Sequence, residues 1–360
     1  MLFLTFASTA FAQVDEHAFK EQINANTVTI LGGSMSGTYL RFADDIANGI
    51  GSSDDLRVLP VRGPGGAQNV RDILYLRGID MGLVRGDVME TLRGEPHYGN
   101  LAQRLHYISV LYLEEFHVWT SKPEIQSIMD LQGKTVAFHN GGEKSGEVVL
   151  EKFGIKLGKV ISASMFTAAD KLKSGEWDAI VRITGKPISD LEKITEINPD
   201  LRLLPIPYTN ALADTNYVPT TLTHADYPTF IPEGKEVETV GVNAVLAVYN
   251  WPANTDRYAR LVKFTDAFFS NFNRIIDNKG RHSKWDEVNL ASTLKGWQRF
   301  KPAEEWFKKQ AESKTVLTSA DGELANQFKN FLRTKAGAEL RGSDNEKLFQ
   351  AFLSWRKNPQ

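Results

Sequence analysis

The sequence predicts an α/β protein of two lobes, each built on a mostly parallel sheet, followed by a helical C-terminal extension. Strand-like runs alternate with helical patterns along most of the 360 residues, which is typical of a parallel sheet covered on both faces. Two long apolar runs, 108–120 and 239–249, could each leave one lobe and enter the other. From Trp251 onward the pattern is almost entirely helical.

The first strand–turn–helix unit begins with residues 27–39, TVTILGGSMSGTY, an apolar strand, a glycine- and serine-rich turn and the start of a helix. Apolar side chains of that helix fall at helical spacing and predict one buried stripe: Tyr39, Phe42, Ala43, Ile46, Ala47 and Ile50. Backbone N–H groups at the helix start, together with the positive end of the helix dipole, can bind an anion. The alternative is a tight turn that binds nothing.

The glycine-rich turns do not match the known nucleotide motifs. A Walker loop needs Lys and then Ser or Thr after its last glycine, but Gly37 is followed by Thr38. The spacing of Gly32, Gly33 and Gly37 also differs from the dinucleotide fingerprint G-x-G-x-x-G. A second stretch, 139–146, has a Lys-Ser pair without the glycine before it. A nucleotide-dependent enzyme is therefore disfavoured.

Two further units complete the first lobe. Residues 56–61 predict a strand that leads through the turn 62–66 into a helix, and residues 79–84 predict a strand that ends at Arg85. In such sheets ligands lie beyond the carboxyl ends of the strands, so these turns mark the expected binding cleft.

The second lobe repeats this order. We expect a strand at 135–138, a turn at 140–142, a helix from about 145 to 153 and strands at 159–163 and 178–184. Thr167 is expected to cap the helix between the last two strands. The expected boundaries are 26–115 with 238–280 for the first lobe, 116–237 for the second, and 281–360 for a helical extension packed on the first.

Composition excludes several classes of function. The formal net charge is −2, so no global basic field attracts nucleic acid, and the absence of cysteine rules out disulfides and thiolate sites. No two of the seven histidines are spaced as helical metal ligands. We therefore expect no metal and no cofactor.

The N-terminus resembles an export signal. Residues 1–12, MLFLTFASTAFA, form an apolar run that ends in the A-x-A pattern of a signal-peptidase site. No Lys or Arg precedes the run, and the alternative is a buried apolar end. The sequence favours a periplasmic protein whose signal peptide is removed.

Five stretches, in order and spacing, resemble the TAXI family of solute receptors. They are TILGGSMSGTY (29–39), GGAQN (65–69), IDMGLVRGD (79–87), DLQGKTV (130–136) and GEWDAIVRITGKP (175–187). TAXI receptors are the extracytoplasmic substrate-binding subunits of TRAP transporters, and the resemblance covers residues 27–251. Further stretches are similar to a longer branch of the family: 217–219, 222–227, 282–285 and 287–290.

The resemblance implies a type II periplasmic-binding-protein-like fold with the ligand in an interlobe cleft. It also implies closure about the crossing strands and delivery of the solute to an ion-coupled TRAP membrane permease. Such closure is a population shift, because the ligand contacts both lobes only in the closed form. Receptors of this kind are usually monomers, and we expect the same here.

Two arginines at strand ends predict the charge of the ligand. Arg85 and Arg182, on opposite lobes, are expected to clamp one small carboxylate-bearing solute, since guanidinium groups bind carboxylates in a two-pronged geometry. The alternatives are pairing of Arg85 with Asp87 and of Arg182 with Asp178 or Glu176. The other expected ligand contacts are Ser34, Ser36, Gly37, Thr38, Tyr39, Gln68, Asn69, Gly86, Asp87, Asn140, Gly141, Gly142, Ser145, Thr184, Gly185 and Tyr217.

Two other functions remain as alternatives. A hydrolase could use the same cleft, but the sequence has no G-x-S-x-G elbow. Glu114 and Glu115 are neighbours on a strand and point to opposite faces, so they make a poor acid/base pair. His117 and His139 are expected to be structural. We therefore expect no enzyme activity; a receptor that serves a signalling partner is the other alternative.

Overall fold

The computed structural model describes residues 16–51, 55–139 and 141–312, together with residues 331, 351, 352 and 354. It forms two compact units, Met1–Ala303 and Glu304–Gln360, and the fold and site described below belong to the first. The predicted signal peptide, Asn140 and most of the C-terminal extension lie outside the described residues.

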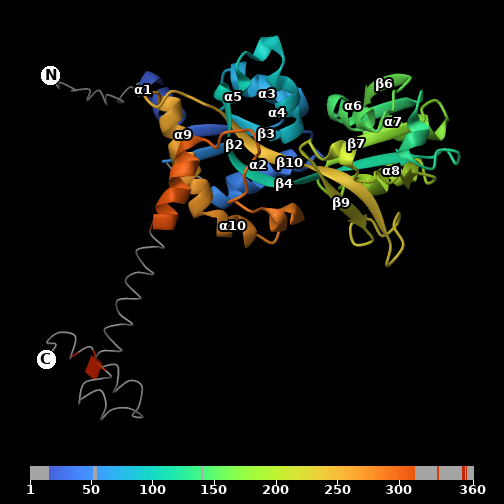
Figure 1. The fold of residues 1–360 in the computed structure, drawn as a ribbon. Helices are drawn as coiled ribbons and strands as arrows, with labels where there is room; N and C mark the ends of the chain where they lie inside the picture. Colours follow the sequence, from blue (N-terminus) through green and yellow to red (C-terminus); the bar gives the residue numbers. More distant parts are fainter. Residues whose placement is uncertain are drawn as a thin grey trace, which may run out of the picture. The chain divides into compact units, whose positions relative to one another are not determined.

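One sheet runs through the first unit in the order β2-β1-β3-β10-β4-β7-β5-β6, and β8 and β9 pair with β4 and β10 (Figure 1). We call β1, β2 and β3 with their helices lobe 1. Their bounds are Thr27–Leu31, Arg57–Val61 and Met81–Arg85, and the helices that follow them are α2 (Thr38–Ile50), α3 (Gly66–Tyr75) and α4 (Gly86–Arg93). These three strands are parallel, as predicted.

Lobe 2 is built on β5, β6 and β7, which are also parallel. Their bounds are Thr135–His139, Lys159–Ala163 and Ala179–Thr184, with helices α6 (Glu143–Lys152), α7 (Met165–Lys173) and α8 (Leu191–Ile197) and strands β8 (Arg202–Leu203) and β9 (Tyr217–Thr223). The prediction that Thr167 caps α7 is wrong. Ser164 is the cap, because its Oγ accepts the Thr167 N–H at 3.1 Å, which places Thr167 inside the first turn.

Two long strands connect the lobes. β4 (Leu105–Thr120) and β10 (Glu236–Tyr249) pair antiparallel over most of their length. β10 pairs with β3 in lobe 1, whereas β4 pairs with β7 in lobe 2 (Figure 1). Their register shifts between Asn243 and Val245, close to the point where the chain leaves one lobe for the other. The prediction of two crossing strands is confirmed, and with it the two-lobe α/β fold class.

The remaining described elements are short or lie at the ends of the unit. They are helices α1 (Glu16–Ala25), α5 (Leu101–Arg104), α9 (Asp256–Ser270) and α10 (Phe272–Ile276), and the 3-10 turns Pro96–Tyr98, Ile128–Leu131, Asn210–Leu212 and Ser283–Glu287. Residues 301–312 are helical. Among the described helices none has the length and apolar character needed to cross a membrane.

Strands β3 and β7 are buried at every residue. Helices cover both faces of such strands, so their sequences are apolar runs rather than alternating patterns. Each nevertheless carries one arginine, Arg85 in β3 and Arg182 in β7. A charge is costly inside a protein unless it is paired or hydrogen-bonded, so these two side chains lead to the site.

Candidate functional site

A small cavity, which we call the central hollow, lies where the strand ends of the two lobes meet. Its volume is about 50 Å³, enough for one or two water molecules. Its lining comes from both lobes and from β4: Gly33, Ser34, Gly37, Thr38, Tyr39, Pro64, Gly65, Gly66, Arg85, Glu114, His139, Arg182, Ile183 and Thr184. The two arginines predicted to share a ligand therefore do line one cavity.

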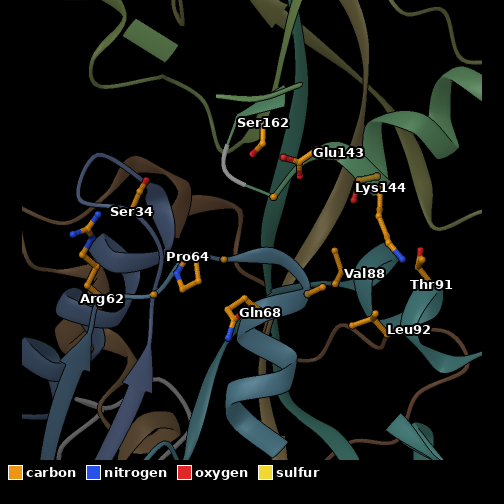
Figure 2. A pocket seen from close by; sticks show the side chains of 15 residues that line it. Ser34, Arg62, Pro64, Gln68, Val88, Thr91, Leu92, Glu143, Lys144 and Ser162 are labelled. Atoms are coloured by element: carbon orange, nitrogen blue, oxygen red, sulfur yellow. The ribbon is translucent and has the colours of Figure 1, made fainter. Parts of the chain in front are cut away.

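A larger cavity, the outer cavity, adjoins the central hollow, because Ser34 and Gly65 line both. Its volume is about 440 Å³, which is within the range of small-molecule sites. Arg62 and Gln68 of lobe 1 lie on one side, and Glu143, Lys144 and Ser162 of lobe 2 on the other (Figure 2). Ser145 of lobe 2 also lines this cavity.

Arg85 is the last residue of β3 and is 4% exposed. Its Nη2 reaches into lobe 2, where it donates to the Ser145 Oγ at 2.9 Å and to the Gly141 carbonyl at 3.4 Å. Its Nε donates to Asp87 Oδ1 at 3.4 Å, and Nη1 lies 3.9 Å from Glu114 Oε2. The guanidinium is thus buried between the lobes rather than solvated, and it pairs with Asp87 as the alternative interpretation expected.

Arg182 enters the central hollow from β7 and is 2% exposed. Its Nη1 donates to Asp190 at 2.7 Å, and its Nη2 donates to the Ser36 carbonyl of lobe 1 at 3.4 Å. Its Nε has no hydrogen-bond partner among the described residues. The predicted pairing of Arg182 with Asp178 is wrong, because Asp178 lies four residues earlier along an extended chain, roughly 13 Å away. Asp178 pairs with Lys122 instead.

Glu176, the other predicted partner of Arg182, pairs with Lys171. Asp190 was not foreseen, because it comes after the turn that follows β7 and immediately precedes α8. Only the path of that turn brings its carboxylate back to the strand.

Glu114 is a site residue that the sequence reasoning missed. It lies on β4, is 3% exposed and accepts hydrogen bonds from the hydroxyls of Tyr39 at 3.1 Å and Tyr112 at 3.4 Å. Burial raises its pKa to about 7, although nearby Arg85 favours the ionised form. The expectation that Glu114 and Glu115 point to opposite faces still holds, since Glu115 contacts Lys284 instead. The feature of the sequence that could have identified Glu114 is a carboxylate within an apolar run.

His139 ends β5 at the central hollow. Burial lowers its pKa to about 4, with a further contribution from Arg182, so the ring is neutral at pH 7. The ring nitrogens make no hydrogen bond of ordinary geometry with the described residues, although the Ala163 backbone lies near them. His117 lies away from the hollow, hydrogen-bonded to Tyr227 at 2.8 Å.

The other predicted contacts fall into three groups. Ser34, Gly37, Thr38, Tyr39 and Thr184 line the central hollow, and Ser34, Gln68, Gly141 and Ser145 line the outer cavity. Direct contacts join the turns at the strand ends of the two lobes, which we call the rims. One of these contacts is between the hydroxyls of Thr38 and Thr184, 3.3 Å apart. Ser36 contributes its carbonyl, which accepts from Arg182 and Ser189.

The third group lines neither cavity. Gly86, Gly142 and Gly185 pack against neighbouring side chains or backbone. Asn69 is fully buried, and its amide binds the carbonyls of Gly32 and Leu83 and the N–H of Gly65, so it holds the turns that form the rim.

Asp87 and Tyr217 line a third cavity, of about 320 Å³, where the Tyr217 hydroxyl donates to Asp87 at 2.8 Å. Burial and the Asp87 carboxylate raise the pKa of Tyr217 well above its ordinary value. The tyrosine is therefore a hydrogen-bond donor between lobes. Asn140 lies outside the described residues.

The site brings together groups that can bind an anion. Two guanidinium groups, hydroxyls and a carboxyl group face one another across the lobes. Within residues 16–51, 55–139 and 141–312, no three or more His, Asp or Glu side chains gather as a metal site would require.

Comparisons with known proteins give likenesses of structure only. No protein-family model matches the chain, and neither does any curated protein. The structure is similar to one described as a periplasmic transporter, with 12% identity and a TM-score of 0.46 over 82% of this chain and 97% of the other. It is also similar to the substrate binding protein of an amino acid ABC transporter (13% identity, 70% and 98% coverage, TM-score 0.42). A third likeness is to holo ArgBP from T. maritima (15% identity, 71% and 93% coverage, TM-score 0.41).

Proposed function

We propose that this protein is an extracytoplasmic solute receptor that binds a small carboxylate-bearing solute between its lobes. The observation that carries the proposal is the placement of Arg85 and Arg182, which are both buried, belong to opposite lobes and line the same hollow. Guanidinium groups buried in this way hold a carboxylate strongly, because each bond is charge-assisted and desolvated.

The solute is proposed to occupy both cavities. Its carboxylate lies against Arg182 Nε, the group with no partner among the described residues, and its remaining atoms extend into the outer cavity. The central hollow alone, at about 50 Å³, is too small for such a solute. Binding therefore begins in a more open form, and closure brings both rims onto the solute.

Two features of the sequence support the proposed location and partner of the receptor. The A-x-A pattern at residues 10–12 supports export to the periplasm, and the resemblance to TAXI receptors supports delivery to a TRAP permease by a monomer. In this proposal the solute is released unchanged, because the guanidinium groups and hydroxyls of the site serve to bind it.

Alanine substitution tests the proposal. Succinate, glutamate and benzoate would be titrated calorimetrically into the wild type, R85A, R182A and the control R202A. Arg202 also lies in lobe 2 and donates to the carbonyls of Lys122 and Ile125, but it lines neither cavity. We expect at least a tenfold loss of affinity in R85A and R182A and less than a twofold change in R202A. Unchanged affinity in both site variants would defeat the proposal.

A further inference from the structure

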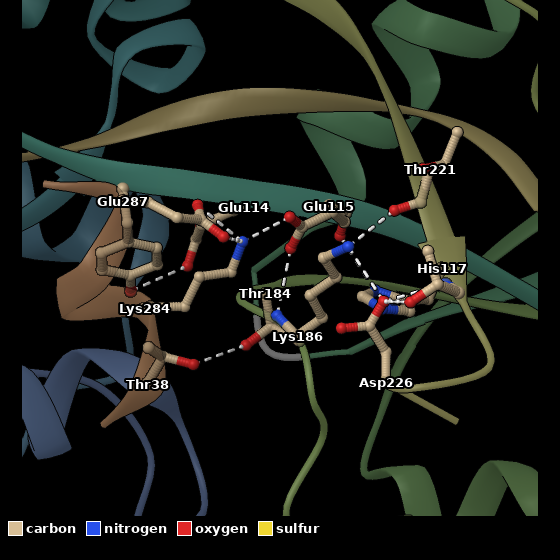
Figure 3. A network of polar contacts seen from close by, with 12 residues as sticks. Thr38, Glu114, Glu115, His117, Thr184, Lys186, Thr221, Asp226, Lys284 and Glu287 are labelled. Carbon is tan, nitrogen blue, oxygen red and sulfur yellow. Dashed lines mark hydrogen bonds and ion pairs between the residues drawn. The ribbon is translucent and has the colours of Figure 1, made fainter. Parts of the chain in front are cut away.

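A buried lysine from the chain beyond the lobes lies directly behind the site. Lys284, in the turn Ser283–Glu287, is 2% exposed. Its ammonium forms a close ion pair with Glu115 and donates to both carboxylate oxygens of Glu287, at 2.7 and 2.9 Å (Figure 3). Lysine is among the residues least often fully buried, and it is stable there only when it is paired.

The turn that carries Lys284 is attached to lobe 1. Asp45, on α2, accepts hydrogen bonds at 2.9 Å from both the Trp285 indole N–H and the His282 backbone N–H. The Trp285 ring stacks on Phe42 of the same helix, with ring centroids 4.2 Å apart. Any movement of lobe 1 as a body therefore carries Lys284 with it.

Glu115, in contrast, is the first residue of β4 that pairs with β7 of lobe 2, although the boundary expected from the sequence placed residue 115 at the end of lobe 1. It lies opposite Thr184 of β7 in the sheet register. Its Oε2 accepts the backbone N–H of Lys186 at 3.0 Å, while its Oε1 faces Lys284. The Lys186 ammonium is held within lobe 2 by Asp226 at 2.9 Å and the Thr221 carbonyl at 2.8 Å. One carboxylate thus joins a lysine of lobe 1 to a turn of lobe 2.

This junction adjoins the binding site. Thr184, at the start of that turn, lines the central hollow and contacts Thr38 of lobe 1. The next residue, Gly185, packs so closely that an added Cβ would lie 3.2 Å from the Lys284 Cγ and 3.3 Å from the Thr38 Cγ2. The lysine stem therefore fills the space behind the point where the two rims touch.

We propose that Lys284 is a positioning residue for solute capture: its ion pair with Glu115 holds the turn that begins at Thr184 against lobe 1 and so stabilises the closed arrangement. The part of this proposal that concerns solute capture rests on the function proposed above. The ion pair depends on closure, because its two partners move with different lobes. A buried pair is also sensitive to small separations, since its attraction acts in a medium of low dielectric constant.

Interlobe distances measured without any solute test the proposal. The chain has no cysteine, so the pair R71C/K152C gives one spin label on α3 of lobe 1 and one on α6 of lobe 2. Both positions are exposed. Pulsed electron paramagnetic resonance would then report the closed fraction for the wild-type background, K284M and the control K122M. Lys122 is a comparable control, because its ammonium pairs with Asp178 within lobe 2 and its side chain lines neither cavity.

We expect K284M to lower the closed fraction at least threefold and K122M to leave it within a factor of 1.5. The effects of K284M and E115Q should also be strongly non-additive. The double variant K284M/E115Q leaves no unpaired buried charge at this contact, so it replaces K284M if that variant does not fold. An unchanged closed fraction in K284M or the double variant, an equal loss in K122M, or a background without any closed component would overturn the proposal. Because no solute is present, failure of the proposed function would show only in the separate titrations.

Discussion

The backbones of the two lobes come into contact at Gly66 and Gly141. A substitution of Gly66 can therefore distinguish an effect on closure of the lobes from an effect on folding stability. Gly66 has φ +56°, and an added Cβ would lie 3.0 Å from the Gly141 carbonyl oxygen. Gly99 has a similar φ of +58°, with ψ −139°, and an added Cβ would meet nothing within 4 Å. The variants G66A and G99A therefore both place an alanine at positive φ, and only the first adds an interlobe clash.

The two contributions can be given magnitudes. An alanine at positive φ costs about 1–3 kcal/mol, depending on ψ, so both variants should lose free energy of unfolding. In G66A the rims must also part by a few tenths of an ångström in the closed form. If this costs the closed form a further ~1.4 kcal/mol, affinity falls about tenfold.

Differential scanning fluorimetry would measure stability, and calorimetric titration with the tightest of succinate, glutamate and benzoate would measure affinity. We expect lower melting temperatures in both variants, a tenfold weaker affinity in G66A and less than a twofold change in G99A. Equal affinity losses in both variants would refute the reasoning, because the contact between the rims would then have no role in binding.

Three further substitutions test the local physics. Glu114 has a pKa of about 7 when folded and near 4.5 when exposed, so its contribution to stability is lost as pH rises through that window. The E114Q variant does not titrate at this position. Its free energy of unfolding in urea, relative to that of the wild type, should therefore rise by on the order of 2 kcal/mol from pH 5 to pH 8. A difference between the two proteins that does not change with pH would contradict this. Ser164→Ala should cost about 1 kcal/mol and Ser164→Asp much less, because Asp also caps; equal costs would exclude capping. Asn69→Ala leaves three backbone groups unpaired and should cost about 3 kcal/mol; a cost below 1 kcal/mol would show that water replaces the amide.

The crossing strands and the parallel sheets could be predicted because they follow from local pattern. Strands buried on both faces must be apolar throughout, so β3, β4, β7 and β10 stand out as runs without alternation. The same pattern makes a charge within such a run conspicuous, which is how Arg182 was predicted; Arg85 was predicted from its position at the carboxyl end of a strand.

The partners of these charges could not be predicted, because they depend on how distant segments return to the strands. Asp190 reaches Arg182 only through the path of the turn after β7, and Ser145 reaches Arg85 from the other lobe. Glu114 is also a charge within an apolar run. Because Glu115 follows it directly, the sequence suggested a possible acid/base pair rather than a residue of the binding site. Lys284 lies 169 residues from its partner Glu115, and no local pattern links the two.

The measurement that tests the central claim most directly is recovery of the natural solute. A denaturing extract of the purified protein would be analysed by mass spectrometry, and the recovered compound would be added back to the spin-labelled protein. The account predicts a small carboxylate in near-equal molar amount, chemically unchanged after incubation, that shortens the distance between the lobes. A compound that the protein converts, or one that binds and leaves this distance unchanged, would contradict it.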